Sequence, residues 1–448
     1  MKFKKAIIPI LMMGLGSSAI AKVSQQEVNQ LGNSLTPVGA QMSGNAEGTI
    51  PAYSGGLPQD SAVNFLADIY ADEKPLFTIT AANLDQYKDK LSDGQIAMFT
   101  KYPNSYRMPI YPTHRTANYP KQILDKAKKN AANTELSSAG NGLLNFDDTL
   151  PFAVPKNGLE VIWNHIARFR GGSVQLNTAQ IAVEDNGAFT PIKIRGQLNS
   201  PNYLIDPYSK KKDKNILFYY TQYVKAPARY TGNIFLVHET IDQVKQTRKA
   251  WTYNAGQRRV RRAPQIAYDA PTVNGSGMRT SDQMDMYNGA PNKYNWKLVG
   301  KQELYIPYNA YKMVDANVPY ADILKTNHIN SDYARYELHR VWKVEGTLKD
   351  NERHIYAKRT FYIDEDSWQV SVADHYDNRG ELWRISEGHP LQFVGVNTQW
   401  LVGTTNYDLF TNKYVVDLFG RETNPFVFDT QVKRNSFSAS AIRRMGKR

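Results

Sequence analysis

The chain has 448 residues, no cysteine and a formal net charge of +13 at pH 7. The lack of cysteine excludes disulfide bonds, thiolate nucleophiles and thiolate metal sites, and the length exceeds what one compact core usually holds. The positive charge favours anionic lipid head groups, acidic protein loops or acidic glycans as partners.

Residues 1–21 have the three parts of an export signal. Three lysines precede an apolar run over 6–14, and the small-x-small cleavage site AIA follows at 19–21. We therefore predict a cleaved signal peptide and a soluble mature protein in the periplasm. Loss of the three lysines lowers the net charge from +13 to +10.

No transmembrane helix is expected in the mature chain. The apolar run of the signal is too short to span a bilayer, and no later stretch approaches about 18 consecutive apolar residues. No cysteine follows the cleavage site, so neither a lipoprotein nor an integral membrane protein is expected.

Residues 22–150 are predicted to wrap around the rest of the fold. Residues 22–60 are rich in glycine and proline and show no helical or strand period, which favours an extended course over another surface. Residues 79–100 and 120–136 have helical patterns. Four apolar side chains of the extended part could dock: Val38, Ile50, Tyr53 and Leu57.

Residues 151–430 are predicted to form an antiparallel sheet domain. It opens with an amphipathic helix over 155–172, in which apolar residues recur at 3–4 spacing. Strand patterns follow from residue 188 onwards, and residues 333–348 alternate strictly. One face of that strand carries Tyr336, Leu338, Trp342 and Val344. The other face carries Glu337, His339, Lys343 and Glu345.

The next two strand patterns, 353–363 and 367–376, continue the alternation, and the turns at 349–352 and 364–367 are short and polar. They place three more residues on an apolar face: Phe361, Trp368 and Val370. We therefore predict a mainly β fold with helices, of the α+β class, built on a large curved antiparallel sheet. A two-sheet sandwich would bury the apolar faces against each other, whereas an incomplete β-barrel would leave a concave surface for a helix. Periodicity does not separate the two.

The stretch AWTYNAGQRRVRRAP, at 250–264, contains four arginines: Arg258, Arg259, Arg261 and Arg262. A hairpin with its turn at 254–257 would place Trp251 and Tyr253 on one face, with Val260 or Arg259 beside them. One interpretation is a basic rim at the mouth of an apolar cavity, suited to a lipid with an anionic head group. The other, which the pattern alone favours, is a pair of exposed strands whose arginines meet acids: Asp242, Asp269 or Asp282. An exported protein meets little nucleic acid, so nucleic-acid binding is not expected.

Motifs of catalysis and metal binding are largely missing. The sequence has no G-x-S-x-G elbow, no G-x-x-x-x-G-K-[ST] loop and no G-x-G-x-x-G turn. His339, His354 and His375 lie on consecutive predicted strands, but strand pairing would place His354 near Asp377 and His339 far from that pair. We therefore expect no catalytic residue, no metal and no cofactor.

Two groups of carboxylates remain, at 147–148 and 364–366. Both are predicted in loops or turns, where acids are expected for turn chemistry. A glycoside hydrolase would need two carboxylates across a cleft, and a sequence does not give that distance.

The C-terminal residues 431–448 carry six basic residues and no acid. A solvated, flexible tail is favoured there over a specific membrane-surface contact.

Six segments occur in a specific order along nearly the whole mature chain: LTPVGAQMSGNAEGTIPAYSGGLP, GLEVIWNHIARFRGG, AWTYNAGQRRVRRAPQIAYDAP, WKLVGKQELYIPYNAY, RYELHRVWKVEGTL and RHIYAKRTFYIDEDSWQ. Together they resemble a family of exported Gram-negative proteins known as domain of unknown function 1329. The resemblance implies no agreed enzymatic activity.

More distantly, the chain is similar to the LolA and LolB carriers of the outer-membrane lipoprotein-sorting fold. Those carriers place a W-x-Y strand and a basic strand in an incomplete antiparallel barrel, which wraps a helix and holds acyl chains on its concave side. Trp251, Tyr253 and residues 258–262 match that strand pair. Members of the larger family are often encoded beside an exporter of the resistance-nodulation-division type and an outer-membrane partner. The resemblance therefore implies a periplasmic shuttle for a lipid or another hydrophobic molecule.

The leading hypothesis is a non-catalytic periplasmic carrier that binds this ligand on the concave face of the sheet and works with the exporter and the outer-membrane protein. Its ligand-binding residues would be Trp251, Tyr253, Tyr336, Leu338, Trp342, Val344, Phe361, Trp368 and Val370. Its basic rim would be Arg258, Arg259, Arg261 and Arg262. A carrier requires a cavity or groove on the apolar face, and the sheet would be structural if the chain's own helix, GLEVIWNHIARF, filled that cavity.

Two alternatives stay open. A cell-envelope scaffold between an inner-membrane exporter and an outer-membrane channel predicts a filled core and a large exposed apolar patch. A periplasmic glycan hydrolase predicts a polar cleft with two close carboxylates.

Overall fold

The computed structural model describes residues 23–60, 66–137, 140–263, 269–272, 276–419 and 425–447, and the predicted signal peptide lies outside them. The α-helices are α1 (Gln25–Val28), α2 (Asp93–Lys101), α3 (Lys121–Asn133), α4 (Gly158–Ile166), α5 (Lys210–Asp213), α6 (Tyr311–Val314), α7 (Tyr320–Ile323) and α8 (Ala439–Gly446). None of these helices has both the length and the apolar character needed to cross a membrane.

The strands are β1 (Phe77–Ile79), β2 (Met108–Ile110), β3 (Glu135–Leu136), β4 (Leu143–Leu144), β5 (Ser173–Val183), β6 (Ile192–Asn199), β7 (Ile216–Ala226), β8 (Ile234–Thr240), β9 (Lys249–Asn254), β10 (Arg259–Arg262), β11 (Tyr294–Pro307), β12 (Tyr336–Leu348), β13 (Lys358–Asp364), β14 (Val370–Tyr376), β15 (Leu382–Phe393), β16 (Thr398–Asp408), β17 (Tyr414–Phe419) and β18 (Phe426–Phe428).

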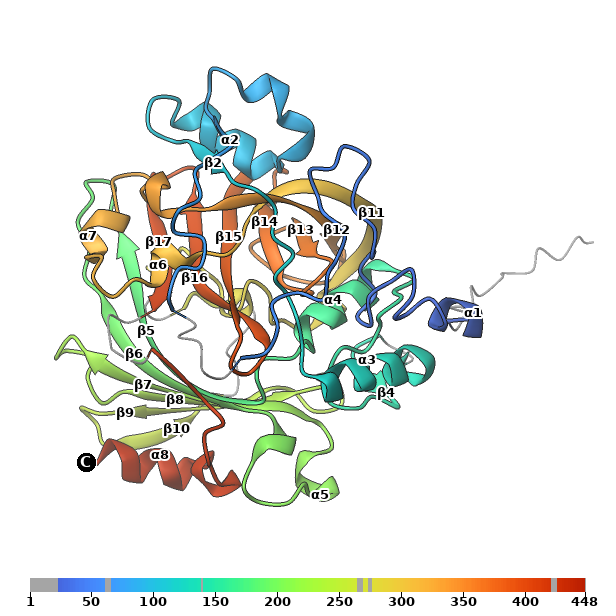
Figure 1. Cartoon of the computed structure of the whole chain (residues 1–448). Helices are drawn as coiled ribbons and strands as arrows, with labels where there is room; N and C mark the ends of the chain where they lie inside the picture. The colour runs from blue at the N-terminus through green and yellow to red at the C-terminus, as the bar shows by residue number, and fades with distance from the viewer. Residues whose placement is uncertain are drawn as a thin grey trace, which may run out of the picture.

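One large curved sheet contains all of these strands except β3 and β4 (Figure 1). Its main path runs β1-β2-β12-β13-β14-β15-β16-β17-β5-β6-β7-β8-β9-β10, with β11 paired to β12 and β18 to β5. Neighbouring strands are antiparallel, except for one parallel contact of β2 with β12. Within the described ranges, β10 pairs only with β9 and β11 only with β12. The fold is therefore an unclosed, mixed sheet and not a two-sheet sandwich.

The strands β12 to β14 are buried on both faces, so the prediction of a single apolar face is wrong. Glu337 and His339 are as deeply buried as the apolar residues with which they alternate. On one face, the backbone N–H of Gly94 in α2 donates to Asp374 at 3.1 Å. On the other face, α4 packs at Val344, whose strand register continues to Ala373, the neighbour of Asp374. Two helices from the N-terminal half thus cover opposite faces of the sheet.

Residues 23–60, which we term the N-terminal strap, begin with α1 and continue through turns, bends and irregular segments. Val38 and Ile50 are buried, and Tyr53 and Leu57 are half-buried. The Val38 carbonyl accepts a hydrogen bond from the indole of Trp368, 330 positions later, at 2.9 Å. The strap is therefore fixed by residues that lie close to it only in the finished fold.

Only the end of the predicted helix 79–100 is an α-helix, because a new N-terminus begins at Ser92. The Ser92 hydroxyl accepts from the Gln95 backbone at 3.1 Å, and the Gln95 side chain accepts from the Ser92 backbone at 3.0 Å. Residues 84–90 form two 3-10 turns instead. The helix predicted at 120–136 is confirmed by α3.

The helix α4 is shorter than the predicted 155–172. It ends at Ile166 because two arginines fold back onto its last turn. Arg170 donates from Nη1 to the Ile166 carbonyl at 2.9 Å, and Arg168 donates to the His165 carbonyl at 3.2 Å. These bonds satisfy carbonyl groups that lack partners at a helix C-terminus.

The C-terminal residues form an ordered element, so the prediction of a solvated, flexible tail is wrong. The Ser438 hydroxyl caps α8 by accepting from the Ala441 backbone at 3.2 Å. The helix lies along β8, β9 and β10, at the lower end of the molecule in Figure 1. Ile442 of this helix and Phe437, just before it, are buried.

Candidate functional site

The nine predicted ligand-binding residues lie in two separate apolar clusters, so the expectation of one shared concave surface is wrong. The main core contains Tyr336, Leu338, Val344, Phe361, Trp368 and Val370, with Trp342 packed against it. The second cluster contains Tyr253, with Trp251 packed against it. Alternation along each strand showed which side chains share a face, but it did not show what covers that face.

The group in the main core is enclosed by the chain itself. The rings of Trp342 and Trp368 stack with their centroids 6.0 Å apart. The buried helix α4 contributes four core residues: Val161, Ile162, Trp163 and Ile166. A Cβ added to Gly158 would lie 2.9 to 3.0 Å from the β11 backbone and from Val344, so no space remains between helix and sheet. The chain's own helix therefore fills the place expected for a ligand.

A polar network fills more of the same side of the sheet. Asp282, in the 3-10 turn Ser281–Gln283, accepts from the fully buried Arg359 at 2.9 Å and contacts His354 at 3.1 Å. Three tyrosine rings surround the Arg359 guanidinium at 4.8 to 5.7 Å: Tyr287, Tyr294 and Tyr356. Burial alone would raise the pKa of Asp282, but the Arg359 charge and the His354 bond hold it well below its usual range. Fixed charges at this depth do not suit an acyl chain.

The three histidines considered for a metal do not converge. His354 binds Asp282 and not Asp377, because the loop that carries Asp282 inserts beside it. His375 stacks on Tyr356 with centroids 4.7 Å apart, in the same network. His339 lies elsewhere, stacked on Tyr308 at 4.0 Å.

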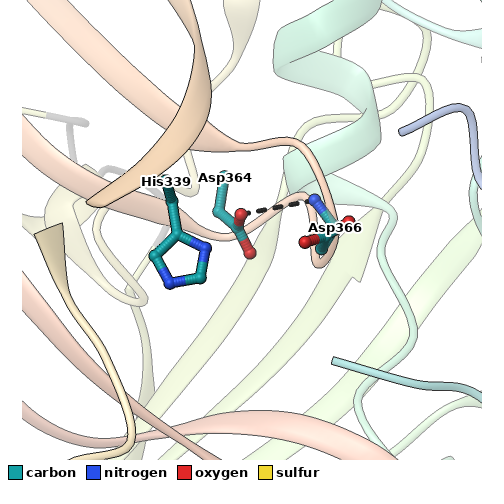
Figure 2. A group of neighbouring side chains, drawn as sticks. All are labelled: His339, Asp364 and Asp366. Carbon is teal, nitrogen blue, oxygen red and sulfur yellow. Dashed lines mark hydrogen bonds between the residues drawn. The ribbon is translucent and has the colours of Figure 1, made fainter. Parts of the chain in front are cut away.

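His339 instead meets the acidic turn at 364–366, as Figure 2 shows. One ligand atom from each of His339, Asp364 and Asp366 lies within 4.8 Å of the others, and all three residues are buried. The predicted turn is confirmed, and the Asp364 carboxylate accepts from the backbones of Asp366 and Ser367, but these acids are also buried. The pairing of Val341 with Asp364, continued by two residues, puts His339 opposite Asp366, so an explicit strand register would have found this cluster.

The charges of the cluster are balanced by cations of the chain. Asp366 accepts both arms of Arg115, at 2.8 and 2.7 Å. Glu365 accepts from Arg340 at 2.8 Å and from Lys301 at 2.7 Å. Burial and the nearby Asp366 charge raise the pKa of Asp364 to about 6, which favours its neutral form. We infer a clamp and not a metal centre, because Arg115 and Arg340 also donate to strap carbonyls of Gln41 and Ser43.

The acids at 147–148 also form ion pairs with basic residues of the chain. Asp147 pairs with Lys129 at 3.0 Å and Asp148 with Lys126 at 2.6 Å, which ties the loop to α3. A shallow apolar groove of about 520 Å³ lies elsewhere, between α2 and the ends of β15 and β16, and no sequence pattern indicated it.

The second cluster is an apolar face of β7, β8 and β9 that α8 covers. Its buried members are Ile216, Tyr219, Ile234, Leu236, Tyr253, Phe437 and Ile442. The hairpin has the predicted shape, with Val260 opposite Tyr253 and Arg262 opposite Trp251. The Tyr253 hydroxyl donates to the Gly446 carbonyl at 3.1 Å. His238 bonds the Phe437 carbonyl at 2.7 Å, and burial lowers the pKa of His238, so the neutral ring serves as the donor.

A basic rim surrounds this cluster. Arg258, Arg259, Arg261 and Arg262 are exposed, and so are Arg443, Arg444 and Lys447 of the adjoining helix end. In the described part of the chain, none of the seven lies within ion-pair distance of an acid. The interpretation in which Asp242, Asp269 or Asp282 neutralises the hairpin arginines is therefore wrong, since Asp282 is committed to Arg359.

Comparison with known proteins gives a match to a family model described as a protein of unknown function, DUF1329, over residues 78–443. An uncharacterized protein of Pseudomonas aeruginosa, PA3922, is 51% identical over 439 residues, which span 97% of this chain and 96% of that protein.

Two solved structures resemble the fold. A DUF1329 family protein from Desulfovibrio piger has 13% identity and a TM-score of 0.42, over 60% of this chain and 91% of that one. A domain from Vibrio parahaemolyticus described as an outer membrane lipoprotein-sorting protein has 14% identity and a TM-score of 0.45, over 64% and 98%. Both resemblances expected from the sequence are thus found. Because the identities and TM-scores are low, we take neither ligand nor partner from these structures.

Proposed function

We propose that this chain, which belongs to the DUF1329 family, is a periplasmic carrier for a hydrophobic molecule with an anionic group, bound on the β7–β9 face that α8 covers. One observation carries the proposal: the second cluster is separate from the main core, and a single eight-residue helix at the chain end closes it. The ligand takes the place of that helix. The residues assigned to it are Trp251 and Tyr253, with Arg262 beside them.

The energies of helix and ligand are comparable. Burial of Phe437 and Ile442 stabilises the covered form by about 1.5–3 kcal/mol for each side chain. An acyl chain gains about 0.8 kcal/mol for each buried methylene, so ten methylenes gain about 8 kcal/mol before the entropy cost of binding. A long-chain amphiphile can therefore displace α8.

The rim suits the charged end of such a ligand. Arginine binds carboxylate and phosphate groups with two parallel hydrogen bonds, and among the described residues no acid lies within ion-pair distance of the rim arginines. In the same proposal, the carrier exchanges its ligand with an exporter of the resistance-nodulation-division type and an outer-membrane protein. The family resemblance supports that step.

The test uses the mature full-length chain and a fluorescent fatty acid. Ile442→Asp places a charge at a fully buried position of α8 and should raise the affinity for the fatty acid at least tenfold. Ser440→Asp places the same side chain at an exposed position of the helix and should bind like the wild type. Mass spectrometry of wild-type protein purified without detergent should identify the natural ligand.

A second pair of variants locates the site. In the Ile442→Asp background, Trp251→Glu should abolish the gain, whereas Trp342→Glu, in the main core, should keep it. Circular dichroism spectra must match the wild type for each variant. Equal affinity of Ile442→Asp and wild type, or equal loss from both tryptophan variants, would refute a carrier site under α8.

The scaffold remains the second candidate because the concave side is filled by α4 and by the Asp282 network. It predicts that Ile442→Asp changes the recovery of envelope proteins in crosslinking experiments without changing fatty-acid affinity.

A further inference from the structure

The lower end of the molecule carries a second basic element, α5, which the carrier proposal does not use (Figure 1). Its three lysines, Lys210, Lys211 and Lys212, are exposed, and so is Lys214, which follows the helix. Ile205 and Tyr208 lie just before it and expose 49% and 51% of their surface. Large apolar side chains exposed among lysines are typical of surfaces that enter the head-group region of a membrane.

A buried ion pair joins α5 to the 3-10 turn Arg434–Ser436, which leads into the C-terminal helix α8. The side chain of Asp213 is fully buried and accepts from Arg434 Nε at 3.0 Å and Nη2 at 2.7 Å. Asp213 also accepts from the Tyr219 hydroxyl at 2.9 Å, and Asp206 accepts from the Arg434 backbone at 2.6 Å. The Ile205 backbone donates to the Val432 carbonyl at 3.0 Å. The two elements therefore present one surface, the α5–α8 face.

The exposed charges of this face are positive. Its two acids, Asp206 and Asp213, are engaged by Arg434. Its exposed charged groups in the described ranges are the α5 lysines together with Arg443, Arg444 and Lys447. Within the part of the chain that the structure describes, none of these cations has an acid within ion-pair distance. Such a surface is attracted to any dense array of negative charge.

We propose that the α5–α8 face docks on a bilayer that contains anionic phospholipid, with Ile205 and Tyr208 in the head-group region and the cations at the lipid phosphates. Binding of an acidic protein would account for the exposed cations, but it would not account for the exposed isoleucine that lies among them. A tyrosine at the level of the head groups keeps its hydroxyl wet and its ring in an apolar environment. This inference goes beyond the carrier proposal and does not depend on it.

The test measures co-sedimentation of the mature chain with vesicles of equal parts phosphatidylglycerol and phosphatidylcholine, against pure phosphatidylcholine. Wild type should bind only the anionic vesicles, and added salt should weaken binding. Each basic residue near an anionic surface is worth roughly fivefold in affinity, so Lys210→Glu/Lys211→Glu/Lys212→Glu should lose about a hundredfold or more. The matched control, Lys121→Glu/Lys128→Glu/Lys129→Glu on α3, changes the net charge equally and should lose less than tenfold.

The apolar contact has its own test. Ile205→Ser/Tyr208→Ser should weaken vesicle binding at least tenfold, whereas Val244→Ser/Phe410→Ser, at two other exposed apolar positions, should not. Equal loss from both lysine triples, an unchanged affinity of Ile205→Ser/Tyr208→Ser, or equal binding to neutral vesicles overturns the proposal. Absence of vesicle binding together with capture by an acidic protein overturns it in favour of a protein partner. Fatty-acid binding by the lysine triple variant is measured in parallel. Wild-type fatty-acid affinity together with lost vesicle binding would show that membrane docking and ligand binding are separate properties.

Discussion

Replacing Arg115 by methionine tests the clamp that holds the N-terminal strap on the sheet. The Arg115 side chain is 3% exposed and donates to both carboxylate oxygens of Asp366, at 2.8 and 2.7 Å. Nη2 also donates to the Gln41 carbonyl of the strap at 2.8 Å. Methionine keeps much of the stem but removes every donor, so Asp366 would stay buried without its cation.

The expected loss is large. Removal of one partner of a buried ion pair costs about 3–5 kcal/mol, because the other charge remains buried and unpaired. The orphaned Gln41 carbonyl adds about 1 kcal/mol. Arg115→Lys should recover only part of this loss, since an ammonium does not reproduce the two-armed contact. Arg115→Met/Asp366→Leu should recover more than half of it, because both charges of this pair are then removed.

The assay is urea unfolding of the mature chain, followed by circular dichroism. Arg379→Met serves as the control, because Arg379 also pairs with an aspartate but its side chain is 70% exposed, so little change is expected there. The clamp reasoning fails if Arg115→Met is as stable as Arg379→Met. It also fails if the double variant is no more stable than Arg115→Met.

Two further predictions concern the two faces of the sheet. Burial, together with the Asp93 charge, raises the pKa of Asp374 to about 7 against an ordinary 3.8. Asp374 therefore loses its proton at a lower pH in the unfolded chain than in the folded one. Between about pH 4 and pH 7 the unfolded state binds fewer protons, so the contribution of Asp374 to stability falls as the pH rises. Asp374→Asn should flatten the pH dependence of the urea midpoint over that window, whereas exposed Asp315→Asn should leave it unchanged. On the other face, Gly158→Ala should lower the free energy of unfolding by about 1–3 kcal/mol through overpacking. Gly395→Ala meets no atom within 4 Å and should be neutral; equal melting temperatures for the two variants would contradict a filled interface at α4.

The strands and the α4 helix could be predicted from local pattern, because alternation and composition act over neighbouring residues. The element that packs on each strand could not be predicted in this way. Trp251 and Trp342 have similar strand contexts, yet α8 covers one and the main core receives the other. The acids at 364–366 read as an ordinary turn because the groups that neutralise them, such as Arg115, lie 251 positions away.

The C-terminal helix could have been predicted in part. Its basic residues suggested a solvated tail, but Ala441, Ile442 and Met445 recur at helical spacing after Ser438, a good capping residue. Charge composition favoured a solvated tail, whereas the apolar periodicity favoured a packed helix. The structure has the helix, which lies against β8 to β10.

The strap also sets an order of events during synthesis. Gln41 is made early, but its backbone N–H pairs with Glu365, 324 residues later. The strap has earlier partners, such as the Ala117 carbonyl, which accepts from the Tyr53 hydroxyl. Its contact with Glu365 has a very long sequence separation, a feature associated with slow folding. The strap therefore completes its contacts only once Glu365 is available. A fragment that ends before residue 364 lacks the Trp368 indole, which donates to the Val38 carbonyl, so this part of the strap is without one of its partners in the finished fold.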